Sequence, residues 1–324
     1  MEKGGSKGGA KRGKRKSGET PPGDTRDTRD DGTPAEPGRV VAHHGVAVLV
    51  RFDAGGERQI WLTPDQRAVA GDRVLVRGDR LVVEEAHGVL RRRDARGRER
   101  TIATNLDLLG IVVAPEPREP PGYIDRGFVI ARAAGIEPMI IVNKTDLEGG
   151  PELAERLEEI YGPSATVLRV CAETGEGVEA IAAALSGGRL GALVGPSGVG
   201  KSSLLNALVE DLDLVVSELN RRSQKGRHTT TTATLHSLAG GGILVDTAGF
   251  KDFIAVDVET VEVAAFFPGF ETALESECRF RDCLHRSEPE CPVLAAVAAG
   301  EISERRHRAY LALLDEIAEP SRRR

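Results

Sequence analysis

The chain has 324 residues, of which 40% are hydrophobic and 29% charged, a composition typical of a soluble globular protein with room for two or three domains. Its formal net charge of −6 gives no overall support for nucleic-acid binding, so any such binding must come from local patches. No run of about 18 apolar residues predicts a transmembrane helix, and no apolar stretch follows the basic N-terminus as a secretory signal requires. We therefore expect a cytoplasmic protein without a membrane partner.

Residues 1–38 are predicted to form a disordered tail. The stretch from Lys11 to Lys16 is basic, and residues 21–38 mix Pro, Gly, Asp, Thr and Arg with almost nothing apolar to bury. The tail is either a solubilising extension or an arm that binds polyanions such as RNA with salt-dependent affinity.

Residues 39–102 are predicted to form a small β-barrel. Short β-rich runs lie at 40–41, 46–50, 60–62, 74–76 and 81–83. Gly55-Gly56, Ala70-Gly71-Asp72 and Gly78-Asp79 separate them as turns. Five short strands in under about seventy residues favour an OB-type barrel, which periodicity alone does not distinguish from an SH3-like barrel.

Residues 103–254 alternate between strand and helix patterns. Strands are predicted at 106–113, 139–142, 166–170, 190–194, 235–238 and 242–246, and helices at 124–134, 153–161, 177–185 and 202–209. This alternation predicts a parallel sheet that binds its ligands at the carboxyl ends of the strands.

A phosphate-binding loop is predicted where the strand at 190–194 meets the next helix. The residues that match the P-loop pattern are Gly195-Pro196-Ser197-Gly198-Val199-Gly200-Lys201-Ser202, and we add Ser203 to the nucleotide-binding set. The loop supplies backbone N–H groups to phosphate oxygens at a helix N-terminus. Lys201 is expected to reach the β- and γ-phosphates, and the Ser202 hydroxyl to bind Mg²⁺.

Asn143-Lys144-Thr145-Asp146 reads as a guanine-recognition loop at the end of a buried strand. Guanine offers two parallel donors, N1–H and the 2-amino group, and the Asp146 carboxylate accepts both, whereas adenine offers neither there. Cys171 and Ala172 open a second loop of this kind, in which the Ala172 N–H is expected to meet the base carbonyl. GTPases usually have serine in place of Cys171, and a thiol is the weaker donor.

The remaining nucleotide contacts are expected in two later loops. Within Gly226-Arg227-His228-Thr229-Thr230-Thr231-Thr232, we favour Thr230 as the threonine that closes over Mg²⁺. In Asp246-Thr247-Ala248-Gly249, Asp246 is expected to hold Mg²⁺ through water, and the Gly249 N–H to contact the γ-phosphate. Phe250 follows where many signalling GTPases have a glutamine that orients the attacking water. That role therefore falls to His228 or to a partner molecule.

The order of these loops is unusual. An ordinary GTPase runs from the P-loop to the aspartate-glycine loop and then to the guanine loop, whereas here the guanine loop comes first. The sequence therefore predicts a circularly permuted P-loop α/β GTPase domain that binds GTP or GDP with Mg²⁺.

Residues 255–324 are predicted to form a mainly α-helical zinc-binding domain that ends in a helix at 302–317. Three of the four cysteines of the chain cluster with a histidine, in the spacing C-x4-C-x-H-x5-C formed by Cys278, Cys283, His285 and Cys291. Three thiolates and an imidazole complete a tetrahedral set, which is typical of one structural zinc ion with no open position. Glu288 and Glu290 are not expected to be ligands because the set is already complete.

Together, these features resemble the ribosome small-subunit-dependent GTPases of the RsgA (YjeQ) family, from about Arg39 to the C-terminal helix. The barrel, the linker from Ala103 to Asp107, the permuted order, the Gly-x-His-Thr-Thr-Thr-like segment and the zinc spacing carry the resemblance. It implies a late assembly factor of the small ribosomal subunit that binds its rRNA as a monomer and hydrolyses GTP when the subunit stimulates it. Cys171 in place of serine, Ala248 in place of proline and the basic tail depart from the family pattern.

Two other functions stay open on the residues alone. A GTP-regulated switch that binds a protein partner is compatible with the acidic net charge. A small-molecule or nucleotide kinase would also use a P-loop, but the guanine loops and the lack of an evident acceptor-binding lid argue against it.

Overall fold

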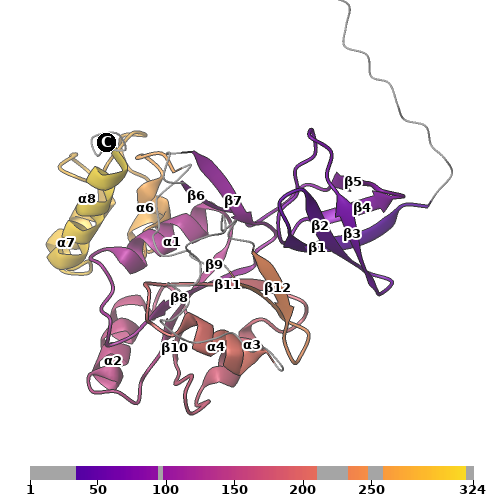
Figure 1. Cartoon of the computed structure of the whole chain (residues 1–324). Coiled ribbons are helices and arrows are strands. Elements are labelled where there is room, and N and C mark those ends of the chain that lie inside the picture. The colour runs from indigo at the N-terminus through magenta and orange to yellow at the C-terminus, as the bar shows by residue number, and fades with distance from the viewer. Residues whose placement is uncertain (1–33, 94–97, 210–232, 247–257, 319–324) are drawn as a thin grey trace, which may run out of the picture. The chain divides into compact units, whose positions relative to one another are not determined.

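The computed structural model describes residues 34–93, 98–209, 233–246 and 258–318, whose helices and strands are labelled in Figure 1. Within these ranges, no helix is both long and apolar enough to cross a bilayer.

The N-terminal part is a five-stranded antiparallel assembly in the order β3-β2-β1-β4-β5. Its strands are β1 (Glu36–His43), β2 (Ala47–Phe52), β3 (Glu57–Trp61), β4 (Arg73–Arg77) and β5 (Arg80–Val83). β1 pairs with both β2 and β4, and its register shifts between Val40 and Ala42, as at a β-bulge that bends the strand. The alternating apolar residues of these strands fill a separate core that includes Val40, Val50 and Val74.

β1 begins at Glu36, inside the range assigned to the tail. Glu36 to Arg39 pair with Val76 to Arg73 of β4, so the strand starts earlier than the boundary expected at residue 39. The sequence signal is weak here because Pro37 and Gly38 are poor strand formers.

A hairpin that the sequence did not predict joins the barrel strands to the α/β part. It consists of β6 (Leu90–Arg93) and β7 (Glu99–Ala103), with Arg92 paired with Arg100. Leu90 and Ala103 are fully buried in the α/β core, in a cluster that also contains Val41 and Ala70 of the N-terminal part, so the hairpin packs where the two parts meet. The arginines that fill most positions of β6 hide the alternation that would mark a strand.

The α/β part follows the predicted alternation closely. Its elements are β8 (Leu108–Val113), α1 (Tyr123–Ala133), β9 (Glu137–Val142), α2 (Gly150–Tyr161), β10 (Val167–Arg169), α3 (Val178–Ala184), β11 (Leu190–Val194), α4 (Lys201–Leu208), β12 (Thr234–Ser237) and β13 (Ile243–Asp246). The sheet order is β10-β9-β8-β11-β13-β12, and all neighbours are parallel except β12, which is antiparallel to β13.

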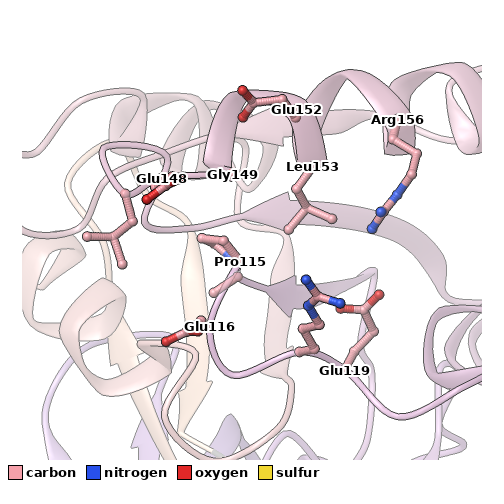
Figure 2. Close-up of a pocket in the computed structure, with 11 residues that line it drawn as sticks. Pro115, Glu116, Glu119, Glu148, Gly149, Glu152, Leu153 and Arg156 are labelled. Carbon is pink, nitrogen blue, oxygen red and sulfur yellow. The ribbon is translucent and has the colours of Figure 1, made fainter.

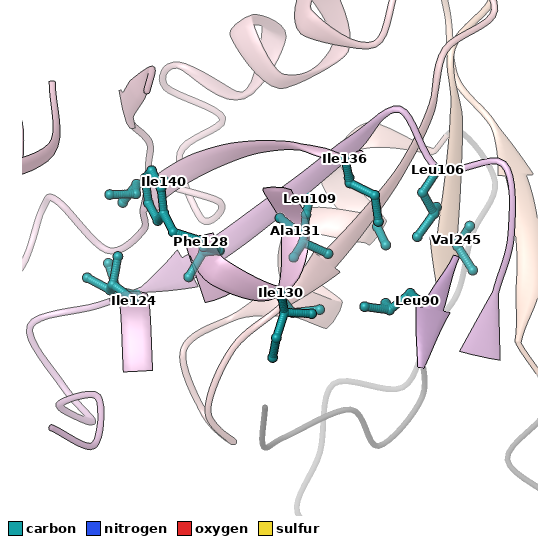
Figure 3. Packing of buried hydrophobic residues seen from close by; sticks show 14 of the residues in the cluster. Leu90, Leu106, Leu109, Ile124, Phe128, Ile130, Ala131, Ile136, Ile140 and Val245 are labelled. Carbon is teal, nitrogen blue, oxygen red and sulfur yellow. The ribbon is translucent and has the colours of Figure 1, made fainter. Parts of the chain in front are cut away.

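Both faces of this sheet are covered, as expected for parallel strands. Leu109 and Ile111 of β8 point into the cluster with α1 and α2, whereas Leu108 and Val112 point into the cluster with α3 and α4. Figure 3 shows Leu109 and Ile140 of the sheet with Phe128 and Ala131 of α1 in the first cluster.

The C-terminal part is mainly helical, with α6 (Val263–Phe266), the 3-10 helix η1 (Ala273–Glu275), α7 (Pro292–Ala299) and α8 (Glu304–Ala318). Phe267, Phe270 and Tyr310 form its aromatic centre, with ring centroids 4.9 to 5.3 Å apart. Val129 of α1 is buried in the same cluster, so this part packs directly on the GTPase-like sheet domain.

Candidate functional site

The predicted phosphate-binding loop lies between β11 and α4, as the P-loop pattern requires. Gly198 and Gly200 have φ angles of 90° and 97°, a region that residues with a side chain rarely adopt. A Cβ at Gly200 would lie 2.2 Å from Asn143 Nδ2, and one at Gly195 would lie 2.5 Å from the Val112 carbonyl oxygen. The glycines are therefore required both by the turn and by the close approach of neighbouring strands.

Lys201 lies over this loop. Its Nζ donates to the carbonyl oxygens of Gly195 and Pro196 at 2.7 and 2.9 Å. The ammonium is thus held at the mouth of the loop, at the N-terminus of α4, where a phosphate group would be stabilised by charge and backbone N–H groups. Ser202 is exposed in the first turn of the same helix, and Ser203 is half-buried beside it.

Asn143 joins three loops that are far apart in the sequence. It is fully buried, donates from Nδ2 to the Val199 carbonyl at 2.9 Å, and accepts the Ala172 N–H at Oδ1 at 3.0 Å. One side chain therefore fixes the predicted guanine loop against both the P-loop and the second guanine loop. Since a buried amide that lost these partners would be costly, the three loops hold one arrangement.

Lys144 makes a second connection to the P-loop. Its Nζ donates to the Gly198 carbonyl at 2.7 Å and to the Glu116 carbonyl at 3.0 Å, and its backbone has a φ of 61°. Thr145 in turn donates from Oγ1 to the Val170 carbonyl at 3.0 Å. The contact with Glu116 shows that the loop after β8 also belongs to this site, which no sequence motif indicated.

Asp146 lies beside Cys171. The thiol Sγ is 3.1 Å from Asp146 Oδ1, and Cys171 is almost fully buried. The thiol therefore donates to the carboxylate, and a serine hydroxyl in its place would be the stronger donor.

Asp246 ends β13, next to the strand that leads into the P-loop. β11 and β13 are parallel neighbours, with Ala192 opposite Val245, so their carboxyl ends meet at one edge of the sheet. Burial raises the pKa of Asp246, while the positive charges of His236 and Lys201 oppose that rise. The carboxylate of Asp246 therefore lies within reach of the charge of the P-loop lysine.

Three predicted residues of the site, Thr230, His228 and Gly249, lie outside the residues that the structure describes, as does Phe250. Their roles stay predictions.

A cavity of about 740 Å³ opens beside the guanine loop, between the loop after β8 and the start of α2 (Figure 2). Four glutamates, Glu116, Glu119, Glu148 and Glu152, line it together with Arg118 and Arg156. No residue of the predicted P-loop lines this cavity, so it is separate from the predicted phosphate site.

The predicted metal ligands come together in the C-terminal part. The Sγ atoms of Cys278, Cys283 and Cys291 and a ring nitrogen of His285 lie within 4.8 Å of one another. The sulfurs lie 3.6, 3.5 and 3.2 Å from His285 Nδ1. Zn–S and Zn–N bonds of about 2.3 and 2.0 Å place tetrahedral ligand atoms roughly 3.5 Å apart, so the four groups fit a metal ion of this size.

The protonation chemistry of the cluster also suits a metal. Burial and the neighbouring thiols of Cys283 and Cys291 raise the pKa of Cys278 to about 12, and burial lowers the pKa of His285. A neutral imidazole is ready to bind a cation, and a thiol as reluctant to ionise as that of Cys278 becomes a thiolate at neutral pH when a cation compensates its charge.

Glu288 has a structural role that sequence reasoning missed. Its carboxylate accepts the backbone N–H groups of Leu284, Arg286 and Ser287 at 2.7 to 2.9 Å. Burial alone raises its pKa, but these donors lower it to about 2. Glu288 is thus not placed as a ligand; it closes the loop that carries His285.

Comparisons with known proteins agree with this geometry. A model of the RsgA GTPase family matches residues 83–255. The small ribosomal subunit biogenesis GTPase RsgA of Pseudomonas fluorescens (strain SBW25) is 37% identical over 302 residues, which cover 89% of this chain and 88% of the relative. The protein of that name from Chromohalobacter salexigens is 39% identical, with 87% and 86% covered.

Two solved structures are similar in fold. YjeQ from Thermotoga maritima has a TM-score of 0.71 and 31% sequence identity, covering 88% of this chain and 99% of that one. YloQ, a circularly permuted GTPase, has a TM-score of 0.67 and 24% identity, covering 93% and 100%, and supports the fold alone. The permuted order of the loops, their meeting at one sheet edge and these relatives show that the chain belongs to the RsgA GTPase family.

Proposed function

We propose that this GTPase acts in the assembly of the small ribosomal subunit, binds its rRNA, and hydrolyses GTP faster when bound to it. The observation that carries the proposal is the Asn143 side chain, which ties the P-loop to both guanine loops although these loops occur in permuted order. This contact brings the predicted phosphate-binding and guanine-recognition loops together, which supports a single guanine-nucleotide site. The names of the relatives supply the ribosomal partner.

The nucleotide contacts follow from the chemistry of each group. Asp146 would accept the two donors of guanine, the P-loop N–H groups and Lys201 would hold the phosphates, and Asp246 and Ser202 would hold Mg²⁺ with Thr230. Bound Mg²⁺ would supply charge neutralisation at the β- and γ-phosphates. Gly249 would contact the γ-phosphate, and His228 is our candidate for orienting the attacking water.

The flanking parts are proposed as the RNA-binding parts. The strand order β3-β2-β1-β4-β5 supports an OB-type barrel over residues 39–102, apart from the hairpin that packs where the barrel meets the GTPase core. Trp61 at the end of β3 is 64% exposed and Val46 in the β1–β2 connection is 63% exposed, in the region that OB barrels use to bind nucleic acid. Cys278, Cys283, His285 and Cys291 would hold a structural zinc ion that organises residues 258–318. A ribosomal partner implies that the protein works in the cytoplasm. We also propose that it works as a monomer.

Sedimentation tests this proposal. Purified protein is mixed with small or large ribosomal subunits in the presence of a non-hydrolysable GTP analogue or GDP, and the bound fraction is measured. We expect binding to small subunits that is stronger with the GTP analogue, and none to large subunits. Lys201→Ala, which removes the phosphate-binding ammonium, should erase the difference between the two nucleotides. Equal binding to both subunits, or to neither, would contradict the proposed partner.

A further inference from the structure

The tip of the metal-binding loop exposes an aromatic ring between two arginines. Phe280 is 40% exposed, and Arg279 and Arg281 on either side of it are exposed as well. A single exposed phenylalanine is common on protein surfaces, and this one is distinguished by its place between two exposed arginines. In a chain with a net charge of −6, two arginines on either side of an exposed aromatic ring are unusual.

The two flanking metal ligands hold this tip in place. Cys278 and Cys283 enclose residues 279–282, and the Cys283 N–H donates to the Phe280 carbonyl at 3.2 Å, which closes a tight turn. Glu288 fixes the other half of the loop through its backbone contacts. The ring is therefore presented on a rigid support, so a partner that binds it pays little conformational entropy.

The surroundings of the ring resemble those of a base-stacking site. The Arg279 guanidinium lies 5.5 Å from the centroid of the Phe280 ring, and Arg279 also forms an ion pair with Glu290. A planar guanidinium beside an aromatic ring is the combination on which unpaired nucleobases stack, and arginines in the same loop are suited to the adjoining phosphates.

We propose that Phe280 is a stacking platform for an unpaired nucleobase of RNA, with Arg281 contacting a neighbouring phosphate. The inference rests on the proposed function and narrows the RNA contact proposed for the C-terminal part to one loop. RNA is favoured over a protein partner because an apolar protein pocket needs only a hydrophobic side chain, whereas the exposed cation of Arg281 beside this ring suits a phosphate; the other arginine, Arg279, is paired with Glu290.

Substitutions at Phe280 and Arg281 distinguish an RNA partner from a protein partner. Full-length protein, Phe280→Tyr, Phe280→Leu and Arg281→Gln are titrated with purified small subunits at several salt concentrations, after metal content is verified in each. Phe280→Tyr should bind as the parent does. Phe280→Leu should bind about 5- to 150-fold more weakly, the fold-change equivalent of ~1–3 kcal/mol per stacked base, with an unchanged salt dependence. Arg281→Gln should instead reduce the salt dependence by about one phosphate contact.

A second measurement does not depend on the ribosome. A single-stranded oligoribonucleotide that contains 2-aminopurine should lose fluorescence when its base stacks on the parent protein, and should lose less on Phe280→Leu. Full binding of the subunit by Phe280→Leu would overturn the inference in favour of an apolar protein pocket. Quenching of the oligoribonucleotide that is the same for both proteins would also overturn it. If the parent fails to bind small subunits, the proposed function fails, and the oligoribonucleotide still decides on the stacking site.

Discussion

Ala42 of the barrel and Asp246 of the nucleotide site lie in one row of the sheet, because each is a cross-strand partner of Thr234. β12 therefore connects the barrel strand β1 to β13, which ends at Asp246, the carboxylate proposed to hold Mg²⁺. In the sequence, only Ala233 separates Thr234 from the segment in which Thr230 is predicted to close over Mg²⁺. A shift of β12 would therefore move residues of both the barrel and the nucleotide site.

Breaking the row tests this connection. Thr234→Pro removes a backbone N–H from the strand, so it should weaken the pairing of β12 with its neighbours. We expect faster amide hydrogen exchange in residues 40–43 of β1 and in β13. Thr234→Val, which keeps a β-branched side chain and the N–H, is the matched control and should exchange like the parent. Unchanged exchange in β1 of the proline variant would show that the barrel is held by other contacts.

Base selectivity tests the role of Asp146. Asp146→Asn replaces an acceptor by an amide, so it should weaken GTP binding and relatively favour xanthosine triphosphate, which has a carbonyl where guanine has its amino group. The parent should prefer GTP to ATP by about 5- to 150-fold, since ATP would leave the carboxylate unpaired at a cost of roughly 1–3 kcal/mol. Calorimetry with the three nucleotides measures this, and equal affinity of the parent for ATP and GTP would refute the assignment.

Removing one metal ligand tests the C-terminal cluster. The parent should carry about one zinc ion per chain by elemental analysis, as a closed set of four ligands predicts. Cys283→Ser should lose the metal and loosen the packing around Tyr310, because metal binding and local folding are coupled. Cys171→Ser is the matched control: it changes the only cysteine outside the cluster and should keep its zinc. Metal-free parent protein purified without chelators would contradict the site.

A buried ion pair should hold the C-terminal part against the GTPase core. Arg306 of α8 contacts Asp125 of α1 at 2.7 Å, with side chains 12% and 6% exposed, and Tyr161 donates to the same carboxylate at 2.9 Å. Arg306→Met leaves a buried carboxylate without its cation and should cost about 3–5 kcal/mol of unfolding free energy, whereas adding Asp125→Asn should recover part of it. Denaturant unfolding of the two single variants and the double variant measures the coupling. Additive effects would show that the pair contributes nothing through its contact.

Much of this architecture follows from short sequence patterns. The P-loop, the guanine loop and the permuted order predicted a circularly permuted GTPase, which the family model and the solved structures confirm. Leu109 and Ile111 alternate with Leu108 and Val112 along a fully buried strand, and this continuous apolar run was readable as a parallel strand.

Other features depend on contacts between distant segments, which a single sequence does not reveal. The pairing of Ala42 with Thr234 joins two strands that are far apart in the sequence, and no residue pattern in either strand indicates which strand it pairs with. The structural role of Glu288 could not be predicted from the sequence, because its three donors are backbone N–H groups that the folded loop brings around it. The hairpin at Leu90 was missed because its arginines obscure the alternation of a strand.

The most direct test of the account is the rate of phosphate release from GTP in a single turnover, with and without purified small ribosomal subunits. Phe250 cannot orient water, so the isolated protein should be slow, and small subunits should accelerate release by about 10³-fold or more, as other supplied catalytic groups do. Large subunits should have no effect, and His228→Ala should lose most of the acceleration while keeping its affinity for GTP and for the subunit. A His228→Ala variant stimulated as well as the parent would place the catalytic group elsewhere. A rate that small subunits leave unchanged in the parent would contradict the account itself.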